Sequence, residues 1–384
     1  MRVRSRKLIV MGLNNLKKIA VNIKRHYLSP DERPWVIGFS GGKDSTCLLQ
    51  MVFQVLANIP PKKRKRFVYV LSSDTLLEPP NISKYLYKTV AQIEKSAHSL
   101  NLPIQTEVVK PTLNDAFFIR LIGYGYPAPN KWFRWCTDRL KIRPANRFIK
   151  SKISLHGSVI LLLGSRRAES PERAKSIKKH YKDDAEDFSP HTSLANAYVF
   201  SPIKDMKTDE IWTYLLQTPC PWGGDNSELV AMYKDANSGE CPLVVDDSTP
   251  PCGNSRFGCW VCTVVERDRS MEGFVEAGYE NYEYLLEFRN WLHELRDNEQ
   301  MREKKKRNGA DGLGPFRLEV RREILNRLLN IQKLVGEELI SNREIGEIKK
   351  IWISDNLSIL RRVSLKNDSG MEETRDNITF SCGM

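Results

Sequence analysis

The chain has 384 residues, of which 41% are hydrophobic, and a formal net charge of +13. This length exceeds one ordinary core and predicts two domains followed by a tail. No stretch approaches the roughly 18 uninterrupted apolar residues of a membrane-spanning helix. The basic N-terminal start also lacks the small-residue cleavage site of a signal peptide, so we expect a cytoplasmic protein that does not associate with membranes.

The positive charge favours a polyanionic partner, above all nucleic acid. Two runs of cations concentrate this charge, "PKKRKR" at 61–66 and "REKKKRNG" at 302–309. Each run is compatible with a phosphate contact or with a solvated loop, which is the commoner fate of such runs.

Strand-like and helix-like segments alternate through the first half of the chain. The expected strands are 34–40, 66–74, 103–111 and 158–165, and the expected helices are 14–28, 44–58, 81–101, 137–151, 169–180 and 207–217. Pro144 should bend or divide the fourth helix. This alternation predicts an α/β fold, a parallel sheet with helices on both faces.

The sequence changes character after this first part. We expect an α/β domain over 1–217, a loop region rich in cysteine, proline and glycine over 218–268, a helical region over 269–365 and a loose tail over 366–384. Helical periodicity returns in the third segment, whereas the tail is polar and aperiodic.

The stretch "IGFSGGKDS" combines a strand, a turn and the start of a helix. The two glycines allow the backbone to approach an anion closely, and the helix N-terminus presents N–H groups with a positive dipole end. The spacing is neither G-x-x-x-x-G-K-S/T nor G-x-G-x-x-G, which disfavours an ordinary P-loop NTPase. The alternative is a tight turn without a ligand. The loop, called the phosphate cradle below, consists of Ser40, Gly41, Gly42, Lys43, Asp44 and Ser45.

A second polar segment, "SSDTLLEPP", places Asp74 and Thr75 at the end of the second strand. Ligands of open α/β sheets gather beyond the carboxyl ends of the strands. Asp74 there could hold ribose hydroxyls or a magnesium ion, and an ordinary turn residue is the alternative.

A third segment, "GSRRAESPERAK", follows the most apolar of the four strands. Arg166, Arg167 and Arg173 are candidate binders of a triphosphate, because the guanidinium fork matches phosphate oxygens. Glu169 could orient one of these arginines or lie at the helix N-terminus. A charged helix start is the alternative.

Four of the eight cysteines lie close together in the loop region, and they are Cys241, Cys252, Cys259 and Cys262. Thiolates in a short Pro/Gly-rich loop can converge on one centre, which favours an iron–sulfur cluster or a zinc ion. The spacing alone does not separate these two metals. A redox-active Cys-x-x-Cys is a third option, although the thioredoxin-like unit that usually carries it is missing.

The motif S-G-G-x-D-S after a strand resembles the signature of the PP-loop ATP pyrophosphatases. The resemblance implies ATP binding, attack at the α-phosphorus and release of pyrophosphate. In such a reaction we expect Asp44 to help place a magnesium ion, and the catalytic cations Lys43, Arg166 and Arg173 to offset the developing charge. Together with "SSDT", "WCTDRLKI" and "GSRRAESPER", the motif resembles the phosphoadenosine phosphosulfate reductase branch of that superfamily.

Cys136 in "KWFRWCTDRLKI" lies where the resembling adenylylsulfate reductases carry a Cys-Cys pair, but here only one cysteine is present. The resemblance implies a 4Fe–4S cluster on Cys136, Cys259 and Cys262, with Cys252 as the fourth ligand and Cys241 as its rival. A remaining cysteine could carry a persulfide. The neighbouring aromatic residues could stack on bases or pack around the cluster, and they are Trp132, Phe133, Trp135 and Trp260.

Over most of its length the sequence resembles the DndC-type proteins of bacterial DNA phosphorothioation, on "SGGKDS", "GSRRAESPERAK" and "SRFGCWVCTVVERDRSMEGF". The resemblance implies an ATP-dependent sulfurtransferase acting on DNA, a cysteine desulfurase as sulfur donor and partner proteins of the same gene cluster. The alternatives are a sulfonucleotide reductase, a tRNA thiolation enzyme and a non-catalytic DNA-binding scaffold.

Overall fold

The computed structural model describes residues 2–180, 187–236 and 257–355. It places a six-stranded sheet in the first half of the chain, with strand order β3-β2-β1-β4-β6-β5. The strands are β1 (Trp35–Gly38), β2 (Val68–Ser73), β3 (Ile104–Val109), β4 (Val159–Leu162), β5 (Phe188–Pro190) and β6 (Ala197–Phe200). All neighbouring strands are parallel except the antiparallel pair β5–β6.

All four predicted strands are confirmed, as β1 to β4, and so is the α/β class with helices on both faces. The helices are α1 (Arg2–Tyr27), α2 (Lys43–Ala57), α3 (Pro80–Ser99), α4 (Arg143–His156), α5 (Pro171–His180), α6 (Thr208–Gln217), α7 (Ser227–Asp235), α8 (Arg269–Glu276), α9 (Tyr282–Arg296) and α10 (Leu318–Val335). The fourth predicted helix continues across Pro144, which lies in the first turn of α4, directly after a π-helical turn (Thr137–Ile142).

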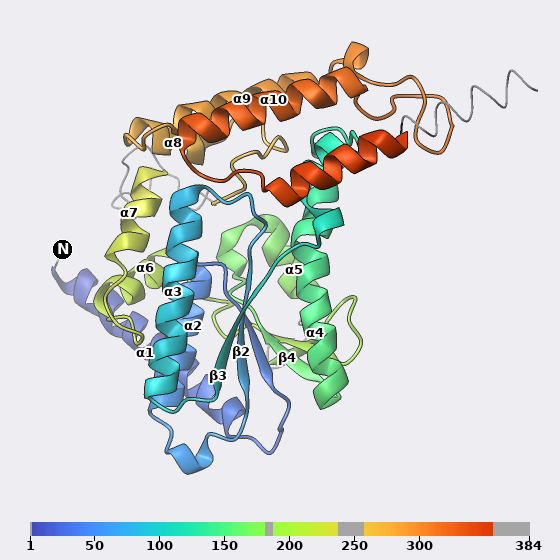
Figure 1. Ribbon diagram of the computed structural model, residues 1–384. Helices are drawn as coiled ribbons and strands as arrows, with labels where there is room; N and C mark the ends of the chain where they lie inside the picture. The colour runs from blue at the N-terminus through green and yellow to red at the C-terminus, as the bar shows by residue number, and fades with distance from the viewer. Residues whose placement is uncertain (1, 181–186, 237–256, 356–384) are drawn as a thin grey trace, which may run out of the picture. The chain divides into compact units, whose positions relative to one another are not determined.

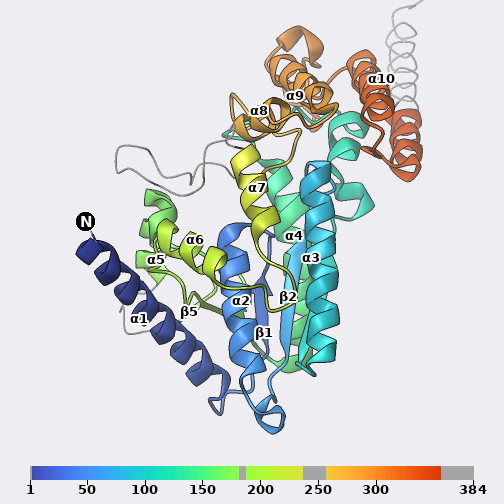
Figure 2. The same cartoon turned by 90° about the vertical axis from the view of Figure 1, so that its left-hand side faces the viewer.

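Residues alternate between the two faces of the sheet, as the pleat requires. Val36, Leu71 and Leu161 belong to a core cluster that packs against Ile149 of α4. On the opposite face, the ring of Trp35 meets that of Tyr27 from α1 at 5.5 Å. Helices α1, α2, α3 and α6 lie on this second face, whereas α4 and α5 lie on the first (Figures 1 and 2).

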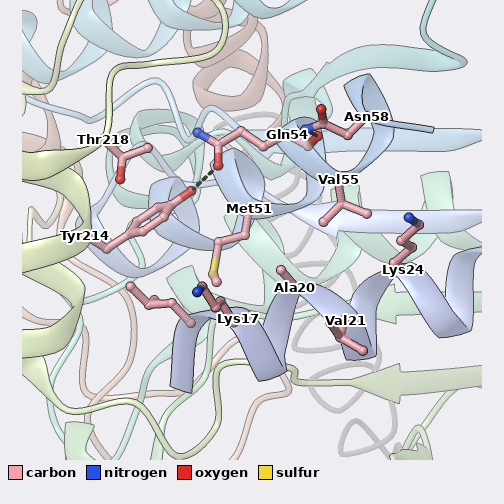
Figure 3. Close-up of a pocket in the computed structure, with 11 residues that line it drawn as sticks. Lys17, Ala20, Val21, Lys24, Met51, Gln54, Val55, Asn58, Tyr214 and Thr218 are labelled. Atoms are coloured by element: carbon pink, nitrogen blue, oxygen red, sulfur yellow. Dashed lines mark hydrogen bonds between the residues drawn. The ribbon is translucent and has the colours of Figure 1, made fainter. Parts of the chain in front are cut away.

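A pocket of about 440 Å³ lies between α1 and the last turns of α2 (Figure 3). Ala20 and Val21 of α1 face Met51 and Val55 of α2, and the Tyr214 hydroxyl donates to Gln54 at one end. The phosphate cradle precedes the first turn of α2, so this pocket lies at the other end of that helix.

The chain divides into two compact units. Unit 1 comprises residues up to 112 together with 129–290, and unit 2 comprises 113–128 together with residues from 291 onward. The short segment 113–128 therefore folds with a part of the chain that follows it by more than 160 residues. A helix over 342–355 ends the described part of unit 2. None of the described helices is long and apolar enough to cross a membrane.

Candidate active site

The phosphate cradle connects β1 to α2 at the carboxyl edge of the sheet. Gly41 has φ +73°, a conformation that favours glycine. The Ser45 hydroxyl donates to the Gly42 carbonyl at 2.9 Å and lies 3.1 Å from the Ser40 hydroxyl. Gly42 precedes α2 and contributes no side-chain cap to it. The two hydroxyls therefore shape the turn, and the positive end of α2 there favours an anion.

Asp44 is held between two cations. The Arg166 guanidinium, 1% exposed, donates through Nε to Oδ1 of Asp44 at 2.7 Å. Lys43 Nζ lies 3.3 Å from Oδ2 of the same carboxylate. Arg166 also donates to the Met206 carbonyl at 3.0 Å. The buried Arg166 guanidinium therefore positions the start of α2. Any effect of Arg166 on a bound triphosphate would be indirect, through Asp44.

This arrangement does not fit a magnesium ion held by Asp44, because two cations already neutralise the carboxylate. Lys43 is itself 5% exposed and lies 5.4 Å from the ring of Tyr233 on α7. The Tyr233 hydroxyl accepts from the Lys43 backbone N–H at 3.3 Å. The lysine is therefore fixed at the mouth of the cradle.

Gly164 is a site residue that the motif analysis did not single out. A Cβ atom there would lie 3.0 Å from the backbone carbon and oxygen of Asp44. The end of β4 and the start of α2 approach one another this closely only because position 164 has no side chain. The dipeptide Gly-Ser after an apolar strand was the only available signal.

Arg173 and Glu169 lie together after β4, with Arg173 Nε 3.5 Å from Glu169 Oε2. Arg173 borders a cavity of about 160 Å³ at the ends of β4 and β6. The cavity is rich in hydroxyl groups, including those of Ser165 and Ser201. Arg167 instead faces Asp205, at 3.0 Å.

The end of β2 carries a polar network around Asp74 and Thr75. Asp74 is 5% exposed, accepts from the Leu76 N–H at 2.8 Å and lies 3.4 Å from Lys110 Nζ. Glu78 accepts from the Thr75 N–H at 3.0 Å and from its hydroxyl at 2.7 Å. Burial raises the pKa of Glu78, and the charge of Asp74 raises it further. Sequence reasoning missed Glu78, because a lone glutamate before two prolines resembles a turn.

Three of the predicted cluster cysteines lie in this neighbourhood. The Thr75 hydroxyl is 3.5 Å from Cys259 Sγ, and the Trp260 N–H donates to the Leu77 carbonyl at 2.9 Å. Burial raises the pKa of Cys259 to about 12. Burial and, second, the nearby Cys262 raise the pKa of Cys136.

The fit to a metal centre is incomplete within residues 2–180, 187–236 and 257–355, where no three His, Cys, Asp or Glu side chains are close enough to hold one ion. Cys241 and Cys252, the two candidates for the fourth ligand, lie outside the described residues. The cluster therefore stays a prediction, and so does the choice of metal.

The aromatic residues near Cys136 separate into two groups. Trp135 and Trp260 are 7% and 1% exposed, and Trp260 packs on Phe288 with ring centroids 5.9 Å apart. Trp132 is 95% exposed and Phe133 46% exposed. Burial in the core accounts for the first pair, whereas Trp132 is not buried.

The first basic run is largely structural. Arg64 donates to the Ala57 and Leu100 carbonyls, which ties together the C-terminal ends of α2 and α3. Arg66 is buried 5.3 Å from the Trp35 ring. Lys62, Lys63 and Lys65 of this run are exposed and, together with Arg66, border a cavity of about 730 Å³ at the amino edge of the sheet.

Fold and cradle together define a class, the α/β enzymes that bind a nucleotide at a glycine-rich turn after the first parallel strand. Residues 34–265 match the phosphoadenosine phosphosulfate reductase domain family, and the chain belongs to that family. The family belongs to the PP-loop ATP pyrophosphatase superfamily, whose members are enzymes that use ATP.

Individual relatives are distant. An uncharacterised protein of Methanocaldococcus jannaschii is 22% identical over 254 residues, which cover 66% of this chain and 41% of that protein. The chain thus spans less than half the length of this curated relative.

Two solved structures are similar to the chain, each with a low TM-score and low sequence identity. The phosphoadenylyl-sulfate reductase of Candida auris is 12% identical with a TM-score of 0.33, covering 52% of this chain and 78% of its own. The U34-tRNA thiolase NcsA of Methanococcus maripaludis, solved with its 4Fe–4S cluster, is 14% identical with a TM-score of 0.32, covering 58% and 73%.

Proposed function

We propose that this protein is an ATP-dependent sulfurtransferase of bacterial DNA phosphorothioation. The observation that carries the proposal is the contact between Cys259 and Thr75 at the end of β2, the strand that pairs with the one leading into the phosphate cradle. It brings a thiol to the same sheet edge as the groups suited to nucleotide activation. The resemblance to DndC-type proteins and the charge of +13 support DNA as the acceptor.

In the proposed first step, a non-bridging oxygen of a DNA phosphodiester attacks the α-phosphorus of ATP, and the bond to pyrophosphate breaks. The N–H groups at the start of α2 and the Lys43 ammonium would offset the charge on the leaving pyrophosphate. Arg166 holds Asp44, and Asp44 holds Lys43, so the ammonium is positioned before ATP arrives.

In the second step, the terminal sulfur of a cysteine persulfide attacks the DNA phosphorus, and AMP leaves. A second thiol then attacks the sulfur–sulfur bond, which leaves sulfur on the DNA and a disulfide that cellular thiols reduce. A cysteine desulfurase would supply the persulfide, and other phosphorothioation proteins of the same gene cluster would act with the chain. An iron–sulfur cluster, if Cys136, Cys259 and Cys262 hold one, would supply a site for sulfur.

The first experiment is mass spectrometry of nuclease-digested DNA from cells with and without the gene, with neighbouring genes intact. Phosphorothioate dinucleotides should disappear with the gene. An unchanged DNA profile would contradict the proposal, and sulfite release from an adenylyl sulfate or loss of thiolated tRNA bases would then identify the reductase or the tRNA enzyme instead.

The cradle itself is tested with Lys43→Ala. Pyrophosphate release should fall about a hundredfold, as when one preorganised charge-stabilising donor is removed. Lys17→Ala on α1 removes an exposed lysine distant from the cradle and should leave the rate unchanged. DNA binding with no ATP turnover by the wild type would favour the non-catalytic scaffold.

A further inference from the structure

Trp132, the most exposed aromatic residue before Cys136, is not buried in the packing of unit 1. Trp132 is 95% exposed, a larger fraction than any other large hydrophobic side chain of the described residues. An indole left in water forgoes one of the largest apolar burials that any side chain offers. Trp132 precedes Cys136, a candidate cluster ligand, by four residues.

The loop that carries Trp132 is held in one conformation. The Asn130 side-chain oxygen accepts from the Trp132 N–H at 2.9 Å and from the Phe133 N–H at 2.7 Å. At the base of the loop, the Thr263 hydroxyl donates to the Pro129 carbonyl at 2.6 Å. The loop is therefore anchored to the segment that follows Cys262, and little ordering is required when a ligand binds.

The charge around the indole identifies the chemistry of the ligand. Lys131 and Arg134 flank the two aromatic residues and are exposed. The stretch 131–143 carries five cations and one carboxylate, Asp138. Binding of an apolar protein surface would remove water from these cations without giving them a partner. A nucleic acid instead provides phosphates for the cations and the face of a base for the Trp132 indole.

We propose that Asn130–Arg134, the aromatic tip, is a stacking platform for an unpaired nucleotide of a nucleic acid. The inference rests on the proposed function only in naming DNA as that nucleic acid. An unpaired nucleotide is required because the faces of bases within a duplex are covered by their neighbours. Trp132 would take the base, and Lys131 and Arg134 would take the adjoining phosphates.

The test measures fluorescence anisotropy of a labelled single-stranded DNA of about 12 nucleotides, within the usual range of single-strand site sizes, with the full chain and without ATP. Trp132→Ala should weaken binding about 5- to 150-fold, the range found for removal of one base-stacking aromatic side chain. The salt dependence should not change, because the indole carries no charge. Arg134→Gln should instead lower the slope of log affinity against log salt by about 0.7.

Two further substitutions identify the kind of contact. Trp132→Phe keeps an aromatic face and should retain most of the affinity, whereas Trp132→Leu keeps apolar area alone and should bind as weakly as Trp132→Ala. Leu155→Ala on α4 is the matched control, because Leu155 is also a strongly exposed apolar side chain, at 70%. This control should bind like the wild type.

Unchanged affinity of Trp132→Ala, full affinity of Trp132→Leu or absence of single-stranded DNA binding by the wild type would each overturn the proposal. Full affinity of the leucine variant would indicate a surface for an apolar protein partner. The assay contains neither ATP nor a sulfur donor, so its result is separable from that of the DNA mass spectrometry. If the tip binds single-stranded DNA in this assay but cellular DNA contains no phosphorothioates, the stacking platform is supported and the proposed reaction is rejected.

Discussion

At the scale of single residues, the cradle depends on how one carboxylate is held. The Arg166–Asp44 pair joins atoms 2.7 Å apart, with the two side chains 1% and 18% exposed. Removing one partner of an ion pair this well buried strongly destabilises the folded state, because the remaining charge stays buried without a partner or water. Arg166 thus couples the stability of unit 1 to the geometry of the cradle.

We therefore expect Arg166→Ala to lower the free energy of unfolding by about 3 to 5 kcal/mol, measured by urea unfolding followed by circular dichroism. Arg167→Ala is the matched control, because its partner Asp205 is 65% exposed and such surface pairs contribute about 1 kcal/mol or less. Equal losses in the two variants would contradict a special role for the buried pair.

Glu78 provides a prediction for pH dependence. Burial raises its pKa in the folded protein, so the unfolded chain loses this proton first as the pH rises. Ionisation of the unfolded state lowers the stability of the fold from about pH 4 upward, until the folded carboxyl also ionises.

Glu78→Gln removes this titration and keeps an oxygen that accepts from Thr75. The free energy of unfolding of the variant relative to the wild type should therefore rise between about pH 4 and neutral pH. Chemical unfolding at several pH values measures this difference. A difference that stays constant over the range would show that the carboxyl is not perturbed.

At the scale of elements, the site exists where β1, β2 and β4 end and α2 begins. Gly164 at the end of β4 allows the contact with the first turn of α2, since a Cβ would lie 3.0 Å from the Asp44 backbone and 3.2 Å from the Ser45 nitrogen. Backbone atoms cannot rotate away as a flexible side chain can. Any added atom must therefore shift the helix that carries the cradle.

Gly164→Ala should accordingly reduce pyrophosphate release about ten- to a hundredfold, because small displacements of positioning groups are costly to catalysis. Gly346→Ala is the control, because it lies in the helix over 342–355 and its Cβ would meet nothing within 4 Å. That variant should be active and slightly more stable, since alanine is the better helix former. Wild-type turnover in Gly164→Ala would mean that α2 tolerates the shift.

The elements also show which strands and helices sequence patterns can predict. β1 to β4 were predictable because buried parallel strands are short apolar runs bounded by turns. β5 and β6 were not predicted, because β5 has three residues and a proline and β6 is only partly buried, unlike the fully apolar runs of β1 and β4. The helix over 14–28 was found, but α1 begins at Arg2, twelve residues earlier than its apolar spacing indicated.

At the scale of the whole molecule, unit 2 is built from two distant parts of the sequence. Phe118, Ile119 and Ile122 of the segment 113–128 are at most 1% exposed. Within unit 2, the Trp352 indole N–H donates to the Ile122 carbonyl at 3.0 Å. The segment cannot be buried in this way without the part of the chain that begins at residue 291.

A chain that ends at residue 290 should therefore expose this segment and self-associate, in contrast to the full chain. Size-exclusion chromatography and binding of a hydrophobic dye would measure this. Phe118→Ser with Ile122→Ser in the shortened chain should reduce the aggregation, because both side chains would face water. A monomeric, cooperatively unfolding chain of 290 residues would contradict the division into these two units.

The sequence by itself determined the parts of this protein that neighbouring residues encode. The strand, the glycine turn and the helix start of the cradle are contiguous over Trp35–Ser45, and hydrophobic periodicity places them without further information. Family membership follows from the same local motifs spread over residues 34–265.

Only the tertiary structure decided which distant residues meet. Arg166 is 122 positions from Asp44, and Cys259 is 184 positions from Thr75. No local preference encodes such pairs, because they form when the packing of strands and helices closes long loops. For the same reason the sequence presented Arg166 as a free phosphate binder, whereas the fold uses its guanidinium to hold the carboxylate of the cradle.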